Sequence, residues 1–536
     1  MTLLEGHASV ATEMVGTVPT TTRFNADDLD RPRVGHNSTT DGGLRLVWRV
    51  SLGLLGLQLL GMLVFTTVQY QRFDLTNDFA TYSQAWTAIA HGHLVPYNTL
   101  LREPYWRNDF ELLIWPLALL YWVFPHTIAL LWIQAAAVLG GELVVLSWAR
   151  EALAKTTGSP RNRARVLGLV TVLLVATPWS WLTVAYDFHL EPFATLFALL
   201  AARDLWAGRH RRLWLWVPLT LVCCAAPGSL FVIAIGLAGL VSRTPSRPIA
   251  IAVVVAGGTW LALTTGIGAT DFGGGVHGSM YAYLAGNTNG HFGTVQLLEG
   301  LVRHPSRAID MFRSHDGYVA GYVASGGVIG LRSRWGLLPA AFVLLPSALN
   351  SNPGFIVFGS SFQSWGAVLF LIVGSAFALR QIVSSESSPG PLLVLGGVAL
   401  VTAVAVAAYG ATLVPGYIQR VSPAAATELA SVQRRLPARA EVVVSQGIIG
   451  RFSVGRSAYY YWPAGVPERY PVPGDHRPVV FIFSPDEGTS DGNAAETRRA
   501  ITYVETRLHA QLMVKGNGIW ALIWAPKEPT NAVVLP

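Results

Sequence analysis

The sequence has few charged residues and almost no cysteine. Only 13% of its 536 residues are Asp, Glu, Lys or Arg, whereas a soluble globular protein carries about 25%. Hydrophobic residues make up 51% of the chain, and the mean hydropathy is +0.41. This composition excludes an ordinary soluble enzyme, and the long apolar runs indicate a chain that crosses a membrane several times.

The two cysteines and the charge balance exclude further classes. Cys223 and Cys224 are adjacent within an apolar run, so they cannot form a disulfide framework, and they lack partners at metal-ligand spacing. We therefore expect neither a structural metal nor redox chemistry there. The 38 Lys and Arg against 31 Asp and Glu give a net charge of +7. A polytopic protein acquires such a surplus by holding cations in its cytoplasmic loops, so we predict no nucleic-acid partner.

The chain begins with a polar segment. Residues 1–43 are rich in Thr, Asp, Gly and Asn without apolar periodicity, which predicts a disordered tail. The first apolar run, Leu44 to Val68, is too long for a cleavable signal and carries Arg45 and Arg49 at its start. By the positive-inside rule it anchors the chain in the cytoplasmic membrane with the N-terminus in the cytoplasm.

Clusters of Arg and Lys between the later apolar runs set the predicted topology. One cluster contains Arg150 and Lys155, and another contains Arg203 and Arg209. Holding all of them in the cytoplasm gives about eleven spans and an external C-terminus. The spans are Leu44–Val68, Thr127–Trp148, Val166–Tyr186, Pro192–Trp206, Leu213–Ala226, Ser229–Val241, Ile249–Ile267, Tyr318–Leu331, Leu337–Leu349, Trp365–Leu379 and Pro391–Leu413.

This topology predicts a membrane domain of residues 44–413 with two large outer loops, 69–126 and 268–317. Within the first loop, Phe110 to Phe124 is expected to lie along the outer interface, where aromatic residues are enriched. Residues 414–536 form a small extracytoplasmic α/β domain, in which Glu441–Gln446, Val479–Phe483 and Gly518–Trp524 read as strands and Thr497–His509 as a helix. The predicted fold class is mainly α, a polytopic transmembrane helix bundle.

Polar residues at the predicted outer face are the candidates for chemistry. Asp78 follows the first span, where a partly desolvated carboxylate can accept a proton from an attacking hydroxyl. It can equally cap the N-terminus of the amphipathic helix that runs towards His91. Asp109 and Glu111 stand beside Arg107; such a group binds a metal or a phosphate, and it also describes a solvated loop.

A third acidic group stands between two predicted spans. Asp187, His189 and Glu191 lie within five residues, and three ionisable side chains at membrane depth are costly unless they meet a ligand, a metal or one another. We expect Asp187 and His189 to face the same cavity as Asp78, with Glu191 opening the following helix.

The second outer loop carries several cations, including Arg303 and Arg307. Arginine has the fork geometry to bind a phosphate or pyrophosphate, although scattered loop cations are more often only solvated. In the C-terminal domain, the aromatic run from Tyr459 to Trp462 can stack on sugar rings or form a packed loop.

Several short motifs carry a resemblance to a known family. They are Asp78 with Gln84-Ala85 and Ala90-His91-Gly92, Asp109-Phe110-Glu111, Tyr121 to Pro125, Tyr186 to Glu191, and Val442 to Gly447. In their order, the chain resembles the lipid-phosphate-sugar-dependent glycosyltransferases of the GT-C superfamily, and within it looks most like a bacterial polytopic membrane family of unknown function. Departures include Ser83, Asp109 and Ala225 to Gly228, where that family tends to carry Asp, His and an acidic motif.

The resemblance implies transfer of a sugar from a polyprenyl-phosphate donor to an acceptor outside the cytoplasmic membrane. Asp78 would be the general base. The implied substrate-binding residues are Asp109, Glu111, Asp187, His189, Glu191, Arg303 and Arg307. No definite cofactor is implied, and a divalent cation near Asp109 and Asp187 is one way to stabilise the leaving phosphate. The implied partners are the lipid bilayer, a polyprenyl-phosphate-linked sugar, and a polysaccharide, glycolipid or protein acceptor.

A non-enzymatic role is the competing interpretation. A transporter should show an internal repeat and broken helices, and no repeat is evident in the sequence. Glu142 lies within a predicted span, where a charge pairs with another helix or marks a pathway. The pattern of apolar runs is equally compatible with a flippase for lipid-linked sugars or with a scaffold for envelope assembly.

Overall fold

The computed structural model describes most of the chain. The described residues are 42–106, 110–156, 159–242, 246–271, 280–285, 294–352, 361–384, 420–462, 468–471, 477–486, 494–526 and 532–536, with single positions at 397, 401 and 404. The predicted tail therefore lies outside them except for Gly42 and Gly43. The predicted span Pro391–Leu413 and the candidate Asp109 lie outside them as well, apart from the three single positions.

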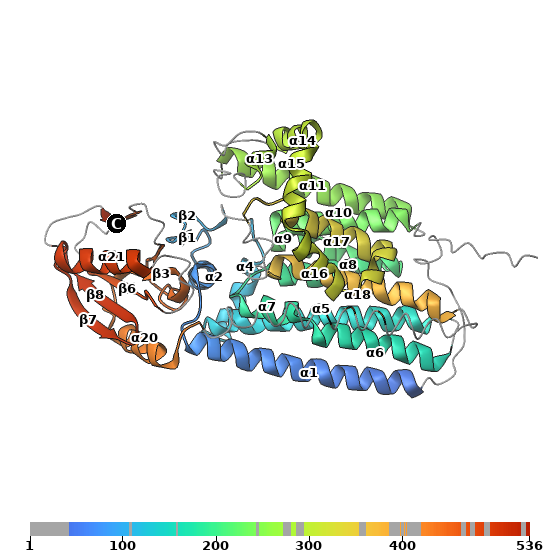
Figure 1. Cartoon of the computed structure of the whole chain (residues 1–536), viewed down its shortest axis with the longest axis horizontal. Helices are drawn as coiled ribbons and strands as arrows, with labels where there is room; N and C mark the ends of the chain where they lie inside the picture. Colours follow the sequence, from blue (N-terminus) through green and yellow to red (C-terminus); the bar gives the residue numbers. More distant parts are fainter. Residues whose placement is uncertain are drawn as a thin grey trace, which may run out of the picture.

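Apolar helices form a bundle that makes up most of the molecule (Figure 1). Their residues are apolar on nearly all sides, as expected for helices that contact both protein and lipid. The helices are α1 (Gly42–Gln71), α5 (Ile128–Ala154), α6 (Pro160–Ala176), α7 (Pro178–Ala185), α8 (Glu191–Trp206), α9 (His210–Cys223), α10 (Ala225–Val241), α11 (Arg247–Asp271), α16 (Asp316–Ser325), α17 (Arg334–Ala348) and α18 (Ser361–Ser384).

Within the described residues, five helices are long and apolar enough to cross a membrane. They are Gly42–Gln71, Ile128–Ala154, Pro160–Ala185, Arg247–Thr264 and Phe362–Gln381. The third comprises α6 and α7, which meet at Thr177 because Pro178 lacks the N–H that would continue the hydrogen-bond ladder. The mainly helical, membrane-spanning fold class is thus confirmed. The predicted number of eleven spans stays a prediction.

The predicted span Tyr318–Leu331 is wrong as one continuous helix. Helix α16 ends at Ser325, and the short 3₁₀ helix η3 (Val328–Arg332) follows. Gly326 lies so close to α18 that an added Cβ would be 2.5 Å from the Cβ of Leu371, and Gly327 has φ 85°. Ten residues of α-helix span about 15 Å, half of the hydrocarbon thickness.

The two predicted outer loops contain short helices and strands. The first holds α2 (Asn77–Ala90), the paired strands β1 (Tyr97–Asn98) and β2 (Glu103–Pro104), α4 (Ile114–Ala118) and the 3₁₀ helix η2 (Leu119–Trp122). Trp122 and Val123 are exposed by 70% and 84%, in keeping with the predicted interfacial segment. The second holds α13 (Ala282–Ala285), α14 (Thr294–Arg303) and α15 (Pro305–Ser314).

The C-terminal part contains the predicted small α/β domain. A five-stranded sheet has the order β4-β3-β6-β8-β7, with β3 parallel to β4 and β6, and β8 antiparallel to β6 and β7. Its elements are α20 (Pro423–Arg435), β3 (Glu441–Ser445), the 3₁₀ helix η6 (Gln446–Ile448), β4 (Ala458–Tyr461), β6 (Val479–Phe483), α21 (Ala494–Thr506), β7 (Gln511–Gly516) and β8 (Ile519–Trp524), beside the pair β5 (Glu468–Pro471) and β9 (Ala532–Leu535). The three predicted strands and the predicted helix are confirmed.

This domain lies against the end of the bundle where α1 ends (Figure 1), which we call the sheet-side end. The backbone N–H of Gly450 donates to the carbonyl of Leu75 at 3.0 Å, and a Cβ at Gly450 would lie 2.5 Å from the Cβ of Leu75. Ser83 of α2 exchanges a 2.9 Å hydrogen bond with Ser453. The sheet domain therefore packs directly on the segment that carries Asp78.

Candidate functional site

Asp78 occupies the first turn of α2 rather than its cap. Thr76 is the N-cap, and its Oγ1 accepts the backbone N–H of Asp78 at 3.3 Å. The interpretation of Asp78 as a capping residue is therefore wrong, because Thr76 already performs that task. The Asp78 side chain is 33% exposed, and its Oδ1 accepts from Asn77 Nδ2 at 3.1 Å. Its carboxylate is held in position and remains open to solvent.

The turn between α7 and α8 brings Asp187 to the start of α2. Asp187 is buried and adopts φ 59°, a left-handed conformation that costs energy in a non-glycine residue. Its Oδ2 accepts from the backbone N–H of Thr76 at 2.7 Å and from the Thr76 hydroxyl. Burial raises the pKa of this carboxyl, although Arg420 and the Thr76 hydrogen bonds oppose the shift. Asp187 thus anchors the helix start that presents Asp78.

His189 lies between two carboxylates. Its Nε2 is 3.7 Å from Asp78 Oδ2, and its Nδ1 is 3.8 Å from Glu191 Oε2. The ring stacks on Phe362 with centroids 3.7 Å apart, and its backbone N–H donates to Gln134 of α5. These contacts fix the imidazole in a place where it can exchange a proton with either acid.

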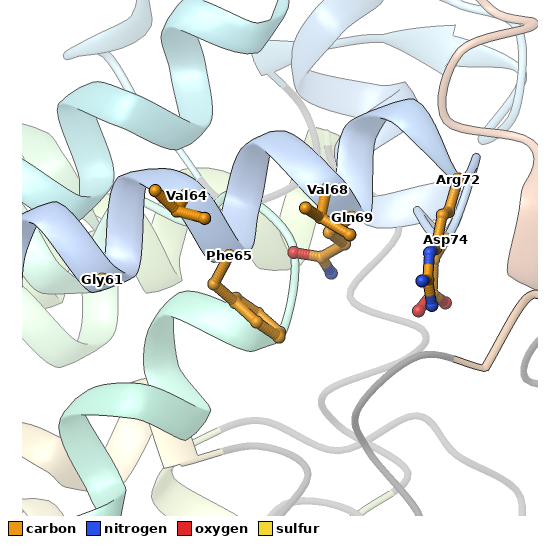
Figure 2. Close-up of a pocket in the computed structure, with 7 residues that line it drawn as sticks. All are labelled: Gly61, Val64, Phe65, Val68, Gln69, Arg72 and Asp74. Atoms are coloured by element: carbon orange, nitrogen blue, oxygen red, sulfur yellow. The ribbon is translucent and has the colours of Figure 1, made fainter. Parts of the chain in front are cut away.

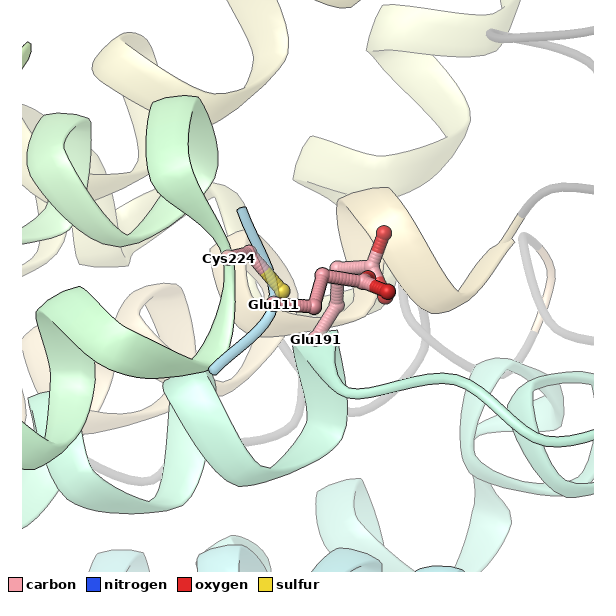
Figure 3. Close-up of side chains that lie close together, drawn as sticks. All are labelled: Glu111, Glu191 and Cys224. Atoms are coloured by element: carbon pink, nitrogen blue, oxygen red, sulfur yellow. The ribbon is translucent and has the colours of Figure 1, made fainter. Parts of the chain in front are cut away.

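Glu111 and Glu191 meet in a second part of the site. The hydroxyls of Tyr82 and Tyr105 donate to the two oxygens of Glu111 at 2.7 and 2.9 Å. Ligand atoms of Glu111, Glu191 and Cys224 all lie within 4.8 Å of one another (Figure 3). The expectation that Cys224 lacks ligand partners is therefore wrong, because the fold supplies them from segments far away in the sequence.

The local cause of this convergence is a backbone contact. Leu113 donates its N–H to the carbonyl of Val222 at 3.0 Å, which ties the segment before α4 to the end of α9. Cys224 follows in an extended conformation between α9 and α10. Burial raises the pKa of the Tyr82 phenol, and the Glu111 carboxylate raises it further, so this tyrosine stays a hydrogen-bond donor.

An ion pair missed in the sequence lies beside this site. Arg420 Nε is 2.9 Å from Asp74 Oδ1, its backbone N–H donates to Asp74 Oδ2 at 3.0 Å, and both side chains are buried. The two residues are 346 positions apart, and only folding brings them together. The arginine that influences Asp187 is therefore Arg420, from the segment that leads into the sheet domain.

A groove of about 260 Å³ follows the last turns of α1 up to this ion pair (Figure 2). It is apolar along α1 and polar where the helix ends. Its lining residues are Gly61, Val64, Phe65, Val68, Gln69, Arg72 and Asp74. Arg72 is exposed at the polar end.

The structure does not bring Arg303 and Arg307 to the site. Arg303 pairs with Glu299 on its own helix, and Arg307 donates to the carbonyl of Tyr283 at 3.1 Å. Neither contacts Asp78, His189 or Glu191 among the described residues. In the sheet domain, Tyr459 and Tyr461 are buried, so these two rings pack in the core rather than offering a face to a sugar.

Most of the chain matches a known protein family. The family described as "Predicted membrane protein (DUF2079)" matches residues 69–434. No curated protein matches the sequence. Among solved structures, the crystal structure of ArnT from Cupriavidus metallidurans bound to undecaprenyl phosphate is similar at 13% identity, with a TM-score of 0.43 over 90% of this chain and 98% of that chain.

Proposed function

This chain belongs to the DUF2079 family of predicted membrane proteins, and from its site we propose that it is a membrane glycosyltransferase. The proposed reaction moves a sugar from a polyprenyl-phosphate donor to a polysaccharide, glycolipid or protein outside the cytoplasmic membrane. Residues 44–413 would be the membrane domain and residues 414–536 the extracytoplasmic domain.

The observation that carries the proposal is the environment of Asp78. Its carboxylate is 33% exposed, while the groups around it are buried and hydrogen-bonded. As general base it takes the proton of an acceptor hydroxyl as the oxygen attacks the anomeric carbon of the sugar. The bond between that carbon and the phosphate oxygen breaks, and the polyprenyl phosphate leaves with the electron pair. His189, 3.7 Å from Asp78, can receive the proton afterwards.

The groove along α1 supports a lipid-linked donor. Its apolar part, from Gly61 to Val68, suits a polyprenyl chain, and the exposed Arg72 stands where the lipid phosphate would emerge. A guanidinium binds phosphate oxygens in bidentate fashion and stabilises the charge on the leaving group. Arg72 thereby takes the role that the sequence suggested for Arg303 and Arg307.

The charge at the other end of the bundle supports the orientation. Arg150 and Arg203 lie near the ends of α5 and α8, and Asp78, Glu111 and Glu191 lie near the beginnings of α2, α4 and α8. Cations favour the cytoplasmic side. The sheet-side end would then face away from the cytoplasm, where envelope acceptors are found.

The test is a transfer assay with purified protein in vesicles and a panel of radiolabelled polyprenyl-phosphate sugars. We expect label to appear in an acceptor, and Asp78→Asn to lower the rate about 10²–10⁴-fold, the usual contribution of a general base. Asp310→Asn is the matched control, because Asp310 is exposed on α15. Full activity of Asp78→Asn would exclude the base role.

The same assay separates a transferase from a flippase. A flippase moves the labelled lipid between leaflets without forming a product bond, so label would cross the vesicle and stay in the donor. Transfer into the acceptor fraction is the result that supports the proposal.

A further inference from the structure

Three side chains from distant parts of the sequence converge in one cluster. Glu111 precedes α4, Glu191 begins α8, and Cys224 separates α9 from α10. One ligand atom of each lies within 4.8 Å of the other two, and Figure 3 shows the carboxylates and the sulfur side by side. We propose that Glu111, Glu191 and Cys224 form a binding site for one divalent transition-metal ion, with Zn²⁺ as the expected ion.

The donor set selects the kind of ion. Magnesium and calcium prefer ligands that are all oxygen, whereas a thiolate favours softer ions, and zinc binds thiolate and carboxylate together. Zinc holds its ligands at about 2.0–2.3 Å, so tetrahedral neighbours are about 3.3–3.7 Å apart. Closing from at most 4.8 Å to that separation requires only small movements of the side chains.

Burial explains what the ion contributes. Glu111 is 3% exposed, Cys224 2%, and the Glu191 side chain 12%. Two carboxylates held close together in a medium of low dielectric resist ionising at the same time. A dication compensates both charges and favours the thiolate form of the cysteine.

The surroundings already orient one of the three ligands. The hydroxyls of Tyr82 and Tyr105 each donate to a different oxygen of Glu111, and each carboxylate oxygen keeps a second lone pair for a metal. Such second-shell hydrogen bonds fix ligands in metal sites. His189 lies next to Glu191 and reaches towards Asp78, so a bound ion would stand one residue away from the proposed base. The metal proposal itself does not depend on sugar transfer.

Cobalt spectroscopy tests the site without an activity measurement. Protein purified in detergent is treated with a chelator and titrated with Co²⁺. We expect a near-ultraviolet thiolate-to-cobalt absorption band that saturates at one ion per chain and is displaced by Zn²⁺. Cys224→Ser should abolish the band. Cys223→Ser is the matched control and should keep it, because the Cys223 thiol donates to the carbonyl of Leu219 instead.

A milder variant tests the orienting hydrogen bond. Tyr105→Phe removes the donor to Glu111 Oε2 without touching a ligand, and should weaken Co²⁺ affinity by roughly 10–100-fold. Glu191→Gln should lose at least as much affinity. Unchanged affinity in both variants would overturn the assignment of Glu111 and Glu191 as ligands.

A band that is absent from the folded wild-type protein, or unchanged in Cys224→Ser, overturns the proposal; the buried acids then share a proton instead of a metal. If the Cys224 variant does not fold, alkylation of the wild-type chain gives the answer. Zn²⁺ should slow the modification of Cys224 by N-ethylmaleimide at least tenfold, as read by mass spectrometry, and equal rates with and without Zn²⁺ contradict the site.

Discussion

The two ends of the helical bundle bury acidic side chains in opposite ways. At the end far from the sheet, Glu151 is surrounded by cations: Arg209 at 2.6 Å, Arg203 at 3.1 Å and Lys155 at 3.3 Å. At the sheet-side end, Glu111 accepts from tyrosine hydroxyls, and Asp78 faces an imidazole. The first arrangement neutralises charge within the protein, whereas the second keeps acids available to exchange protons or bind an ion.

This difference separates stability from chemistry. An acid with several cationic partners stabilises the fold and has little reason to change its protonation state. Acids gathered against one another and against neutral donors are typical of functional sites. We therefore expect substitutions at the far end to lower stability alone, and substitutions at the sheet-side end to act mainly on function.

The largest loss of stability is expected at an exception to this rule, the buried pair of Asp74 and Arg420 at the sheet-side end. Arg420→Ala leaves the Asp74 charge buried, which costs about 3–5 kcal/mol. Denaturant or thermal unfolding in detergent measures it. The double variant Asp74→Ala/Arg420→Ala should recover part of the loss, because no charge is then left behind. A neutral Arg420→Ala single variant would show that the pair does not hold the sheet domain on the bundle.

A smaller loss is expected at Glu151. Glu151→Gln removes the charge that Arg203 and Arg209 share, and hydrogen bonds to charged groups contribute about 1.5–3 kcal/mol each. Unfolding should shift accordingly, while sugar transfer by the folded variant stays unchanged. Asp78→Asn gives the converse pattern, with transfer lost and stability kept. If both variants lose transfer alike, the two ends do not differ in function.

The pH dependence of stability sharpens the contrast. Burial raises the pKa of Asp187 above its ordinary value of 3.8, so the folded chain binds this proton more tightly than the unfolded chain does. The stabilisation by the proton is present below about pH 4 and is lost as pH rises through the raised pKa. Asp187→Asn should remove this part of the dependence. The measurement is the difference in unfolding free energy between variant and wild type across pH, and a constant difference contradicts the shift.

The elements that could be read from the sequence are those with local signals. Apolar runs predicted α1 and α5, and alternation predicted β6, because periodicity depends on neighbours along the chain. The span Tyr318–Leu331 failed because the close approach of Gly326 to α18 is a tertiary constraint. The number of spans and their orientation remain predictions.

The site followed the same division. Asp78, His189 and Glu191 were found as candidates because polar residues are conspicuous between apolar runs, and the fold does bring them together. Arg420 and the partners of Cys224 could not be found, since each lies far along the chain from the residues it meets. Their encounter depends on helix packing, which a local pattern does not encode.

The smallest effect is expected at Arg303, which the sequence offered as a phosphate ligand. Its ion pair with Glu299 is exposed by 69% on the arginine side, and such pairs contribute about 0.2–1 kcal/mol. Arg303→Ala should change the unfolding free energy by no more than this and leave transfer intact, whereas Arg72→Ala, at the end of the α1 groove, should raise the KM for the polyprenyl-phosphate donor. Kinetics over a range of donor concentrations measures both. A KM that rises in Arg303→Ala but not in Arg72→Ala would return the phosphate site to the second loop and leave the groove without its proposed occupant.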